Sequence, residues 1–183
     1  MSIKIEGKQI NLRTLRLSDA KAIYQNVDFD VARYTPIPYP YKLKDAISLI
    51  KKAQSWLKKK AAFVFGIELK EKKQIVGTIS LVRIDYKNKA AELSYWLGKA
   101  YWGKGIMKEA IRLILNFGFK KLRLVRIHAR VMHPNIRSAK LLEKCGFHFE
   151  GRLRKSRLVR GRWIDHLIYS MLRSEFRVRK SRE

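Results

Sequence analysis

The spacing of apolar residues predicts two helices in the first third of the chain. Residues 10–17 alternate between apolar and polar side chains with one irregular step, which is typical of a strand. The following Ser-Asp pair can cap a short helix over residues 20–26. Three prolines between residues 34 and 41 predict a loop. Residues 45–60 place apolar side chains three and four positions apart, with lysines opposite, and so predict an amphipathic helix.

The middle of the chain carries three short segments rich in β-branched and aromatic residues. These segments, residues 62–69, 74–84 and 90–97, are separated by polar turns and predict three antiparallel strands. A glycine-containing turn follows at residues 103–105. After it, apolar residues recur at helical spacing as far as Phe117, which predicts a helix.

The last third predicts a strand, a helix and a hairpin. Residues 124–131 alternate like a buried strand, and residues 135–144 form a helical pattern that stops at Gly146. Residues 147–158 and 163–172 then form a hairpin. The complete order is β-α-α-β-β-β-α-β-α-β-β, which predicts a mixed α/β or α+β fold with one central sheet.

Composition indicates one globular, cytoplasmic domain. A chain of 183 residues fits a single domain, expected over residues 1–173, followed by a basic tail over residues 174–183. The single cysteine, Cys145, cannot form an internal disulfide. The chain has no apolar stretch of the ~20 residues that cross a bilayer, and its start lacks the apolar segment of a secretory signal.

The charge is strongly unbalanced, with 42 lysines and arginines against 15 acids and a formal net charge of +27. Internal ion pairs cannot neutralise this excess. A field of this sign attracts polyanions such as RNA or the ribosome. A generally basic proteome balanced by salt is the alternative explanation of the same composition.

The turn between residues 97 and 106 indicates a phosphate site. A strand leads into Gly103-Lys104-Gly105, and a helix follows whose first N–H groups point into the turn. Such a helix start binds anions, and glycines let the backbone approach a phosphate closely. A tight turn without a ligand is the alternative. The spacing from Gly98 nearly matches a nucleoside-triphosphate loop, but Gly105 stands where that loop needs a serine or threonine.

Three motifs in register resemble the GNAT superfamily of N-acetyltransferases. The turn from Trp102 to Met107 resembles its x-Gly-x-Gly cofactor motif, and the surrounding Glu-Leu-Ser-Tyr-Trp-Leu-Gly string resembles the RimJ/RimL-like branch, which acetylates ribosomal-protein N-termini. The segment 133–151 resembles that branch's Asn-x-x-Ser helix start, Gly-Phe turn and Glu-Gly pair, and the Leu-Arg-x-Leu-Arg-x-x-Asp run at residues 12–19 resembles its opening. The resemblance covers residues 8–172. Trp102 replaces the usual Arg or Gln, and Met107 replaces a small residue.

The resemblance implies the GNAT fold and acetyl-CoA as cofactor. The expected fold has four helices around a central mixed sheet of about seven mostly antiparallel strands. The sheet is expected to splay between its fourth and fifth strands. The cofactor arm would lie in that gap, with the diphosphate on the N–H groups from Trp102 to Lys108 and the thioester carbonyl near Trp96 or Leu97. The implied contacts are Trp96, Leu97, Trp102, Gly103, Lys104, Gly105, Ile106, Met107, Lys108, Asn135 and Ser138.

The implied reaction is transfer of an acetyl group to a primary amine, most closely a protein N-terminal α-amine. The amine attacks directly, so Cys145 need not be catalytic. Glu92 is the predicted base, acting directly or through water, because it lies on the strand that contacts the cofactor; a surface or ion-pair role is the alternative. Many members place a tyrosine acid seven residues after the Asn, but Leu142 stands there, and Ser138 resembles the serine that the RimJ/RimL-like branch offers instead.

Other functions and partners follow less directly from the residues. Asp165 lies in a Trp-Ile-Asp-His run that resembles the branch's last strand, where its role can be structural. The four histidines show no metal-ligand spacing, so no metal is expected. A non-catalytic RNA- or ribosome-binding module and a small-molecule amine acetyltransferase are the alternatives. A monomer or a homodimer without membrane contact is expected.

Overall fold

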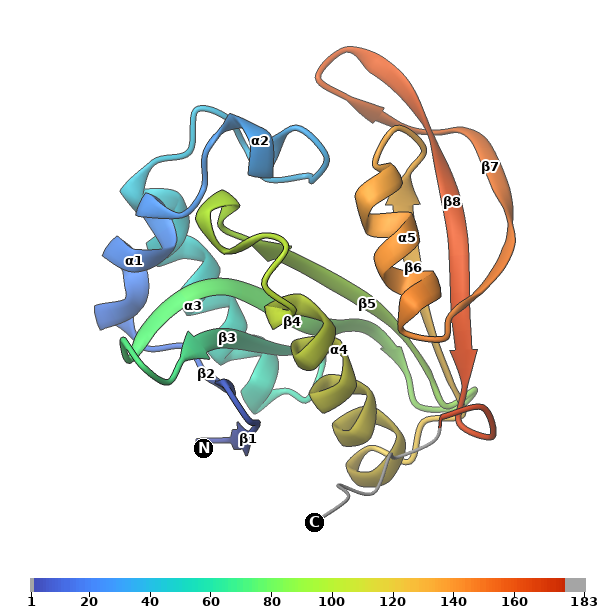
Figure 1. Ribbon diagram of the computed structural model, residues 1–183, viewed down its shortest axis with the longest axis horizontal. Helices are drawn as coiled ribbons and strands as arrows, with labels where there is room; N and C mark the ends of the chain where they lie inside the picture. The colour runs from blue at the N-terminus through green and yellow to red at the C-terminus, as the bar shows by residue number, and fades with distance from the viewer. Residues whose placement is uncertain (1, 177–183) are drawn as a thin grey trace.

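The protein is built around one open sheet of eight strands in the computed structural model, which describes residues 2–176 (Figure 1). The strand order is β1-β2-β3-β4-β5-β6-β8-β7, and only β5 and β6 run parallel to each other. The strands are β1 (Lys4–Glu6), β2 (Ile10–Thr14), β3 (Phe63–Leu69), β4 (Gln74–Asp85), β5 (Ala90–Leu97), β6 (Arg126–Met132), β7 (His148–Val159) and β8 (Arg162–Leu172).

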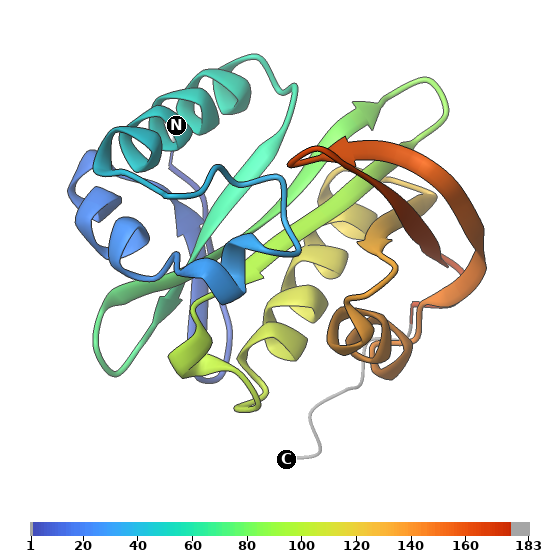
Figure 2. The ribbon, with the colours of Figure 1, turned by 90° about the horizontal axis from the view of Figure 1, so that it is seen from above.

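Helices cover both faces of the sheet. The apolar stripes of α1 (Ala20–Gln25) and α3 (Leu43–Lys58) form one core with the sheet, and α4 (Ile106–Asn116) and α5 (Ile136–Lys144) form a second core with its other face (Figure 2). Alternate side chains of each strand enter opposite cores. On β5, for example, Leu93 belongs to the core of α4, whereas Trp96 belongs to the core of α3.

The α+β fold expected from the pattern is confirmed, and two short elements are additional. Strand β1 pairs with β2 but has only three residues, which is too short to show an alternating pattern. Helix α2 (Phe29–Ala32) is a single turn whose cap, Asp28, accepts a hydrogen bond from Val31 N at 2.9 Å. A π-helical turn, η3 (Phe117–Lys121), extends α4, and 3₁₀ turns precede α1 (η1, Leu17–Asp19) and α4 (η2, Lys99–Tyr101). The predicted tail falls largely on residues 177–183, outside the described residues.

The two parallel strands diverge, as the resemblance implied. Their ladder joins Ala90–Leu93 to Arg126–Ala129, yet β5 continues to Leu97 and β6 to Met132. Strand β4 stays paired with β5 as far as Leu97. The backbone of residues 94–97 therefore has no strand partner on its β6 side. Backbone groups in such a position need other partners, so this stretch can bind an extended ligand.

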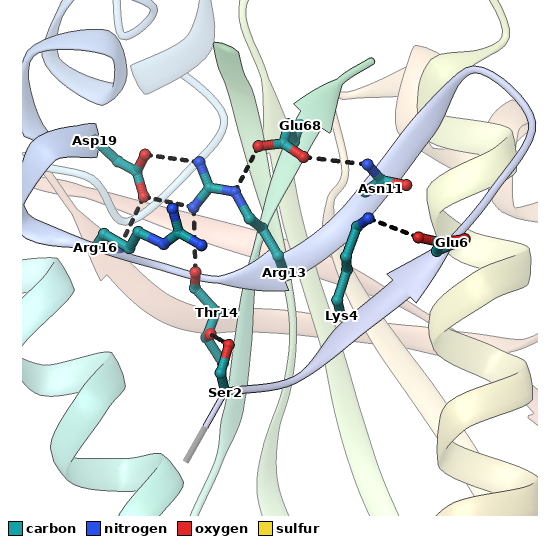
Figure 3. A network of polar contacts seen from close by, with 9 residues as sticks. All are labelled: Ser2, Lys4, Glu6, Asn11, Arg13, Thr14, Arg16, Asp19 and Glu68. Atoms are coloured by element: carbon teal, nitrogen blue, oxygen red, sulfur yellow. Dashed lines mark hydrogen bonds and ion pairs between the residues drawn. The ribbon is translucent and has the colours of Figure 1, made fainter. Parts of the chain in front are cut away.

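A buried ion-pair network explains the Arg-rich motif near the start of the chain (Figure 3). The Arg13 guanidinium donates to Asp19 Oδ1 at 2.8 Å and to Glu68 Oε1 at 2.6 Å. Asn11 donates to the other oxygen of Glu68 at 3.1 Å. The hydrogen bond to Asp19 is the main reason why the pKa of Arg13 is raised, although burial acts against it. Removing one partner would strand a buried charge, so the motif locks η1 onto β2 and β3.

Candidate functional site

The turn before α4 leaves its backbone open to a ligand. Gly103 and Gly105 have φ values of 77° and 75°, in the left-handed region that favours glycine. A Cβ atom on Gly103 would meet nothing within 4 Å, and one on Gly105 would meet only Gln9 Nε2 at 3.9 Å. The space in front of these glycines is therefore unfilled by the protein.

A continuous row of N–H groups lines this turn. Those of residues 103–108 donate to no acceptor within residues 2–176, and the first helical bond of α4 runs from Glu109 N to Gly105 O at 3.0 Å. No side chain caps the helix. Unpaired donors at the positive end of a helix dipole suit a diphosphate. The row is one residue shorter than expected, because Trp102 N donates to Lys99 O in η2 at 3.1 Å.

The two residues that depart from the usual motif have structural explanations. The Trp102 indole Nε1 donates to Leu97 O at 2.7 Å and so ties the turn to the end of β5. The guanidinium carbon of Arg137 lies 4.1 Å from the centre of the same ring, a cation–π contact that brings positive charge to the turn. Met107 is buried in the core beside Ile106, so its side chain does not crowd the phosphate side.

The start of α5 lies next to β5 through a pair of hydroxyls. Asn135 caps the helix, since its Oδ1 accepts from Ser138 N at 3.2 Å. Ser138 Oγ lies 2.8 Å from the Tyr95 hydroxyl. Because Tyr95 lies beyond the last pair of the β5–β6 ladder, this contact spans the divergence of the two strands. The hydroxyl pair therefore lies at the gap between the two strands.

Tyr95 is the site residue that the sequence did not reveal. Burial raises the pKa of its phenol, so the group stays protonated and can donate a hydrogen bond at neutral pH. The expected tyrosine position is instead occupied by Leu142, which is fully buried in the core. A tyrosine is thus present, but it comes from the neighbouring strand and reaches the site through Ser138. Only its place in the Ser-Tyr-Trp run hinted at this.

Glu92 lies at the closed end of the divergence with three basic neighbours. Its register partner on β6 is His128, whose Nε2 is 3.7 Å from Glu92 Oε2. Arg83 Nη1 donates to the same oxygen at 2.6 Å, and Arg130 Nε lies 3.4 Å from it. Burial alone would raise the pKa of Glu92, but these neighbours outweigh burial and hold the pKa at about 2. The carboxylate is therefore ionised at neutral pH and is a weak base.

The other acids near β7 and β8 are also paired with arginines. Glu150 accepts from Arg126 Nη1 at 2.6 Å, and Asp165 accepts from Arg152 Nε at 2.6 Å. The interaction of Asp165 fits the structural role considered for it.

Cys145 is half-buried at the end of α5, and burial raises the pKa of its thiol to about 11, which makes it a poor nucleophile. Among the described residues, no group of three His, Cys, Asp or Glu could hold a metal ion.

The β7–β8 hairpin reaches across to α2. At its tip, the Arg160 Nη2 donates to Ala32 O at 3.0 Å and to Ile37 O at 2.8 Å. The tip meets the loop after α2 above the diverging ends of β5 and β6 (Figures 1 and 2). The two halves of the sheet thus touch again beyond the point where their ladder ends. Within residues 2–176, no helix is long and apolar enough to cross a membrane.

Comparison with known proteins identifies the family. The model of the acetyltransferase (GNAT) domain matches residues 9–148. The chain is 36% identical over 175 residues to the "Probable N-acetyltransferase YjcK" of Bacillus subtilis (strain 168), covering 92% of this chain and 96% of that protein. It is 32% identical over 117 residues to the [ribosomal protein uS5]-alanine N-acetyltransferase of Escherichia coli (strain K12), covering 62% and 59%. It is also 27% identical over 171 residues to the spermidine N(1)-acetyltransferase of Vibrio cholerae, covering 93% and 96%.

Solved structures agree with this assignment. The ribosomal-protein-S5-alanine acetyltransferase of Vibrio fischeri superposes with a TM-score of 0.84 at 27% identity, covering 96% of this chain and all of that one. The microcin C7 self-immunity acetyltransferase MccE, solved in complex with acetyl-CoA and AMP, superposes with a TM-score of 0.81 at 26% identity, covering 91% and 93%. These matches favour an enzyme over a non-catalytic binding module. The chain belongs to the GNAT acetyltransferase family, uses acetyl-CoA, and has ribosomal-protein N-acetyltransferases of the RimJ/RimL type among its relatives.

Proposed function

We propose that the acceptor is the N-terminal α-amine of a protein, of the ribosomal-protein type, met in the cytoplasm on or beside the ribosome. The pairing of the acids carries this proposal. Glu92, Glu150 and Asp165, the acids that could have formed an acidic pocket, each lie against an arginine. Each ammonium group of a polyamine needs a carboxylate of its own. Arginines already engage all three acids, so this site offers at most Glu92, for the one amine that reacts. The net charge of +27 adds long-range repulsion of polycations and attraction to RNA.

In the proposed reaction, acetyl-CoA supplies an acetyl thioester, whose carbonyl carbon the amine nitrogen attacks while the carbon–sulfur bond breaks. The N–H groups of residues 103–108 hold the diphosphate, and main chain near Trp96 and Leu97 orients the carbonyl. Asn135 fixes the start of α5, and Ser138 passes a proton to the departing thiolate while its oxygen takes up a proton from water. Tyr95, hydrogen-bonded to Ser138, orients that hydroxyl.

Glu92 is proposed as the carboxylate that contacts the acceptor amine. Its pKa of about 2 lies far below the value near 7.7–8.0 of an ordinary α-amine, so the carboxylate pairs with the ammonium form more readily than it removes the proton. The proton lost by the amine therefore passes to water, and Glu92 holds the nitrogen in line with the thioester.

The acceptor proposal predicts opposite salt responses for two amines. A neutral peptide with a free N-terminus is expected to be acetylated with a kcat/KM at least about tenfold above that of spermidine at physiological salt. High salt should raise the kcat/KM for spermidine by screening its repulsion from the protein, because the Debye length falls from ~8 Å at 0.15 M to ~3 Å at 1 M. Steady-state assays of thiol release at both salt concentrations, with ribosome co-sedimentation, test this. Efficient spermidine acetylation without ribosome association would favour the small-molecule amine alternative instead.

The hydroxyl pair predicts a second result. Ser138→Ala is expected to lower kcat about tenfold or more with little change in acetyl-CoA affinity, because a proton donor acts in the transition state and not in cofactor binding. Tyr95→Phe keeps the ring and should give a smaller loss, since Ser138 then retains its own hydroxyl. Pre-steady-state turnover and calorimetric binding of acetyl-CoA measure the two quantities. A normal kcat in both variants would reject the pair as the proton route.

A further inference from the structure

Basic side chains gather on the sheet face that carries Glu92. Strand alternation places Glu92 on the face opposite α4 and α5, since its neighbour Leu93 enters the core of α4. The register pairs Glu92 with His128, and Arg130 is the next β6 residue on the same face. Arg83 reaches this face from the irregular end of β4, where the β4–β5 register shifts after Val82.

The arginines of this cluster outnumber its carboxylates. Arg83 and Arg130 share the single carboxylate of Glu92. Their side chains are 59% and 44% exposed, respectively, so both guanidinium groups keep faces open to a ligand. Arg157 adds a third positive charge near His166, where Glu92 and Asp165 are the opposing negative charges, and Asp165 is itself paired with Arg152. Burial lowers the pKa of His166 on β8, and the charges of Arg157 and Arg130 lower it further, so His166 faces both arginines without adding positive charge at neutral pH.

The cluster also lies beside the place where an acceptor must react. The β5–β6 ladder ends at Leu93 and Ala129, and Arg130 is the first β6 residue beyond it. The hydroxyl pair of Tyr95 and Ser138 lies on the same divergence, and Glu92 is the residue before Leu93. An extended chain advances ~3.3 Å per residue. An acceptor whose amine is at Glu92 would thus bring its next one or two side chains within reach of Arg130 and Arg83.

We infer that the preferred acceptor carries a carboxylate close to its reacting amine, in the second or third residue of an N-terminal peptide, and that Arg130 and Arg83 bind it. This inference rests on the proposed function and narrows its substrate class. Guanidinium groups bind carboxylates in a planar, bidentate manner, and a bound carboxylate would balance the unpaired positive charge of the cluster. A basic residue at those positions would meet repulsion instead.

The test compares three peptides that differ only in the residues after an N-terminal alanine, which are glutamate, glutamine or lysine. The expected kcat/KM for the glutamate peptide exceeds that of the glutamine peptide by about two- to fivefold, the range that partly exposed ion pairs give, and the lysine peptide falls below both. Arg130→Gln and Arg83→Gln, both at exposed positions, should each reduce the glutamate-to-glutamine ratio toward one. Lys52→Gln, which removes the same charge from the exposed side of α3, should leave the ratio unchanged.

The outcomes separate this inference from the proposed function. Equal rates for all three peptides would leave N-terminal acetylation standing and overturn the inference, and rate stimulation by a short RNA in that case would point to phosphates as the ligand of the arginines. A glutamate preference that survives in both arginine variants would also overturn the assignment. Failure to acetylate any peptide would reject the proposed function, and the inference would fall with it.

Discussion

Replacing Gly105 with valine is expected to abolish acetyl-CoA binding. Gly105 has a φ of 75°, a conformation that a β-branched residue adopts only with strain of ~1–3 kcal/mol. The added side chain would project into the open space before the turn, where the N–H groups of residues 103–108 await an acceptor. If the backbone rotates to relieve the strain, the N–H groups turn away from the ligand. If the backbone keeps its conformation, the valine side chain occupies the phosphate position. Both results remove the anion site. Isothermal titration should show affinity lower by about 100-fold or more.

Gly161 provides a matched control for this experiment. It has the same φ of 75°, and a Cβ atom there meets nothing within 4 Å. Gly161→Val and Gly105→Val should therefore lower the melting temperature by similar amounts. Acetyl-CoA binding by the Gly161 variant should stay normal, because Gly161 lies at the tip of the β7–β8 hairpin. Normal binding by the Gly105 variant would place the cofactor elsewhere. Loss of binding in both variants would mean that backbone strain alone explains the effect.

Glu92→Gln is expected to lower kcat/KM about 100-fold, by a similar factor from about pH 6 to about pH 9. The wild-type carboxylate has a pKa of about 2, so it stays ionised over this whole range. Its contribution is then the same at each pH, and the rate profile of both proteins follows the titration of the amine. Initial rates with a neutral peptide across this pH range give the comparison. A loss that grows steeply toward low pH would instead support Glu92 as the base that deprotonates the amine.

Glu150→Gln is the matched control, since Arg126 and Ser170 likewise hold the pKa of Glu150 at about 2, although Glu150 lies on β7 and not on either of the diverging strands. The rate of the Glu150 variant should be unchanged.

Stability gives a second measurement for Glu92. Its pKa is depressed in the folded state, so the ion pairs stabilise the fold above the unfolded value of ~4.3, and this stabilisation is lost as the pH falls toward about 2. The stability difference between wild type and Glu92→Gln should shrink over that range.

Local patterns were sufficient to predict most of the elements and the open glycine turn before α4. The strand, the glycines and the helix from residue 90 to residue 116 are contiguous, and their geometry depends on propensities that act within a few residues. The same holds for the Asn135 cap, because its partner Ser138 is three residues away. The divergence of β5 and β6 came only from the resemblance, since strand pairing is not encoded in either strand alone.

The missed features depend on residues far apart in the sequence. Tyr95 meets Ser138 across 43 positions, and Arg160 meets Ala32 across 128. The low pKa of Glu92 depends on Arg83, which reaches it from an irregular segment of β4. Periodicity cannot show such contacts, because they arise only when the sheet is assembled. The prediction of Glu92 as a base therefore took no account of the charges that set its pKa.

The contact of Arg160 with α2 has a consequence for the rate at which ligands exchange. The two halves of the sheet are held together at one end by a ladder of backbone hydrogen bonds. Beyond the ladder, the hydroxyl pair of Tyr95 and Ser138 and the two bonds of the Arg160 guanidinium connect them. Each of the Arg160 bonds adds only ~0.5–1.5 kcal/mol, so thermal motion breaks this contact in a fraction of the molecules at any moment. A ligand chain enters between the halves only in molecules whose Arg160 contact is broken. The contact therefore slows binding and release by the same factor, and it leaves unchanged the equilibrium affinity of a ligand that does not touch it.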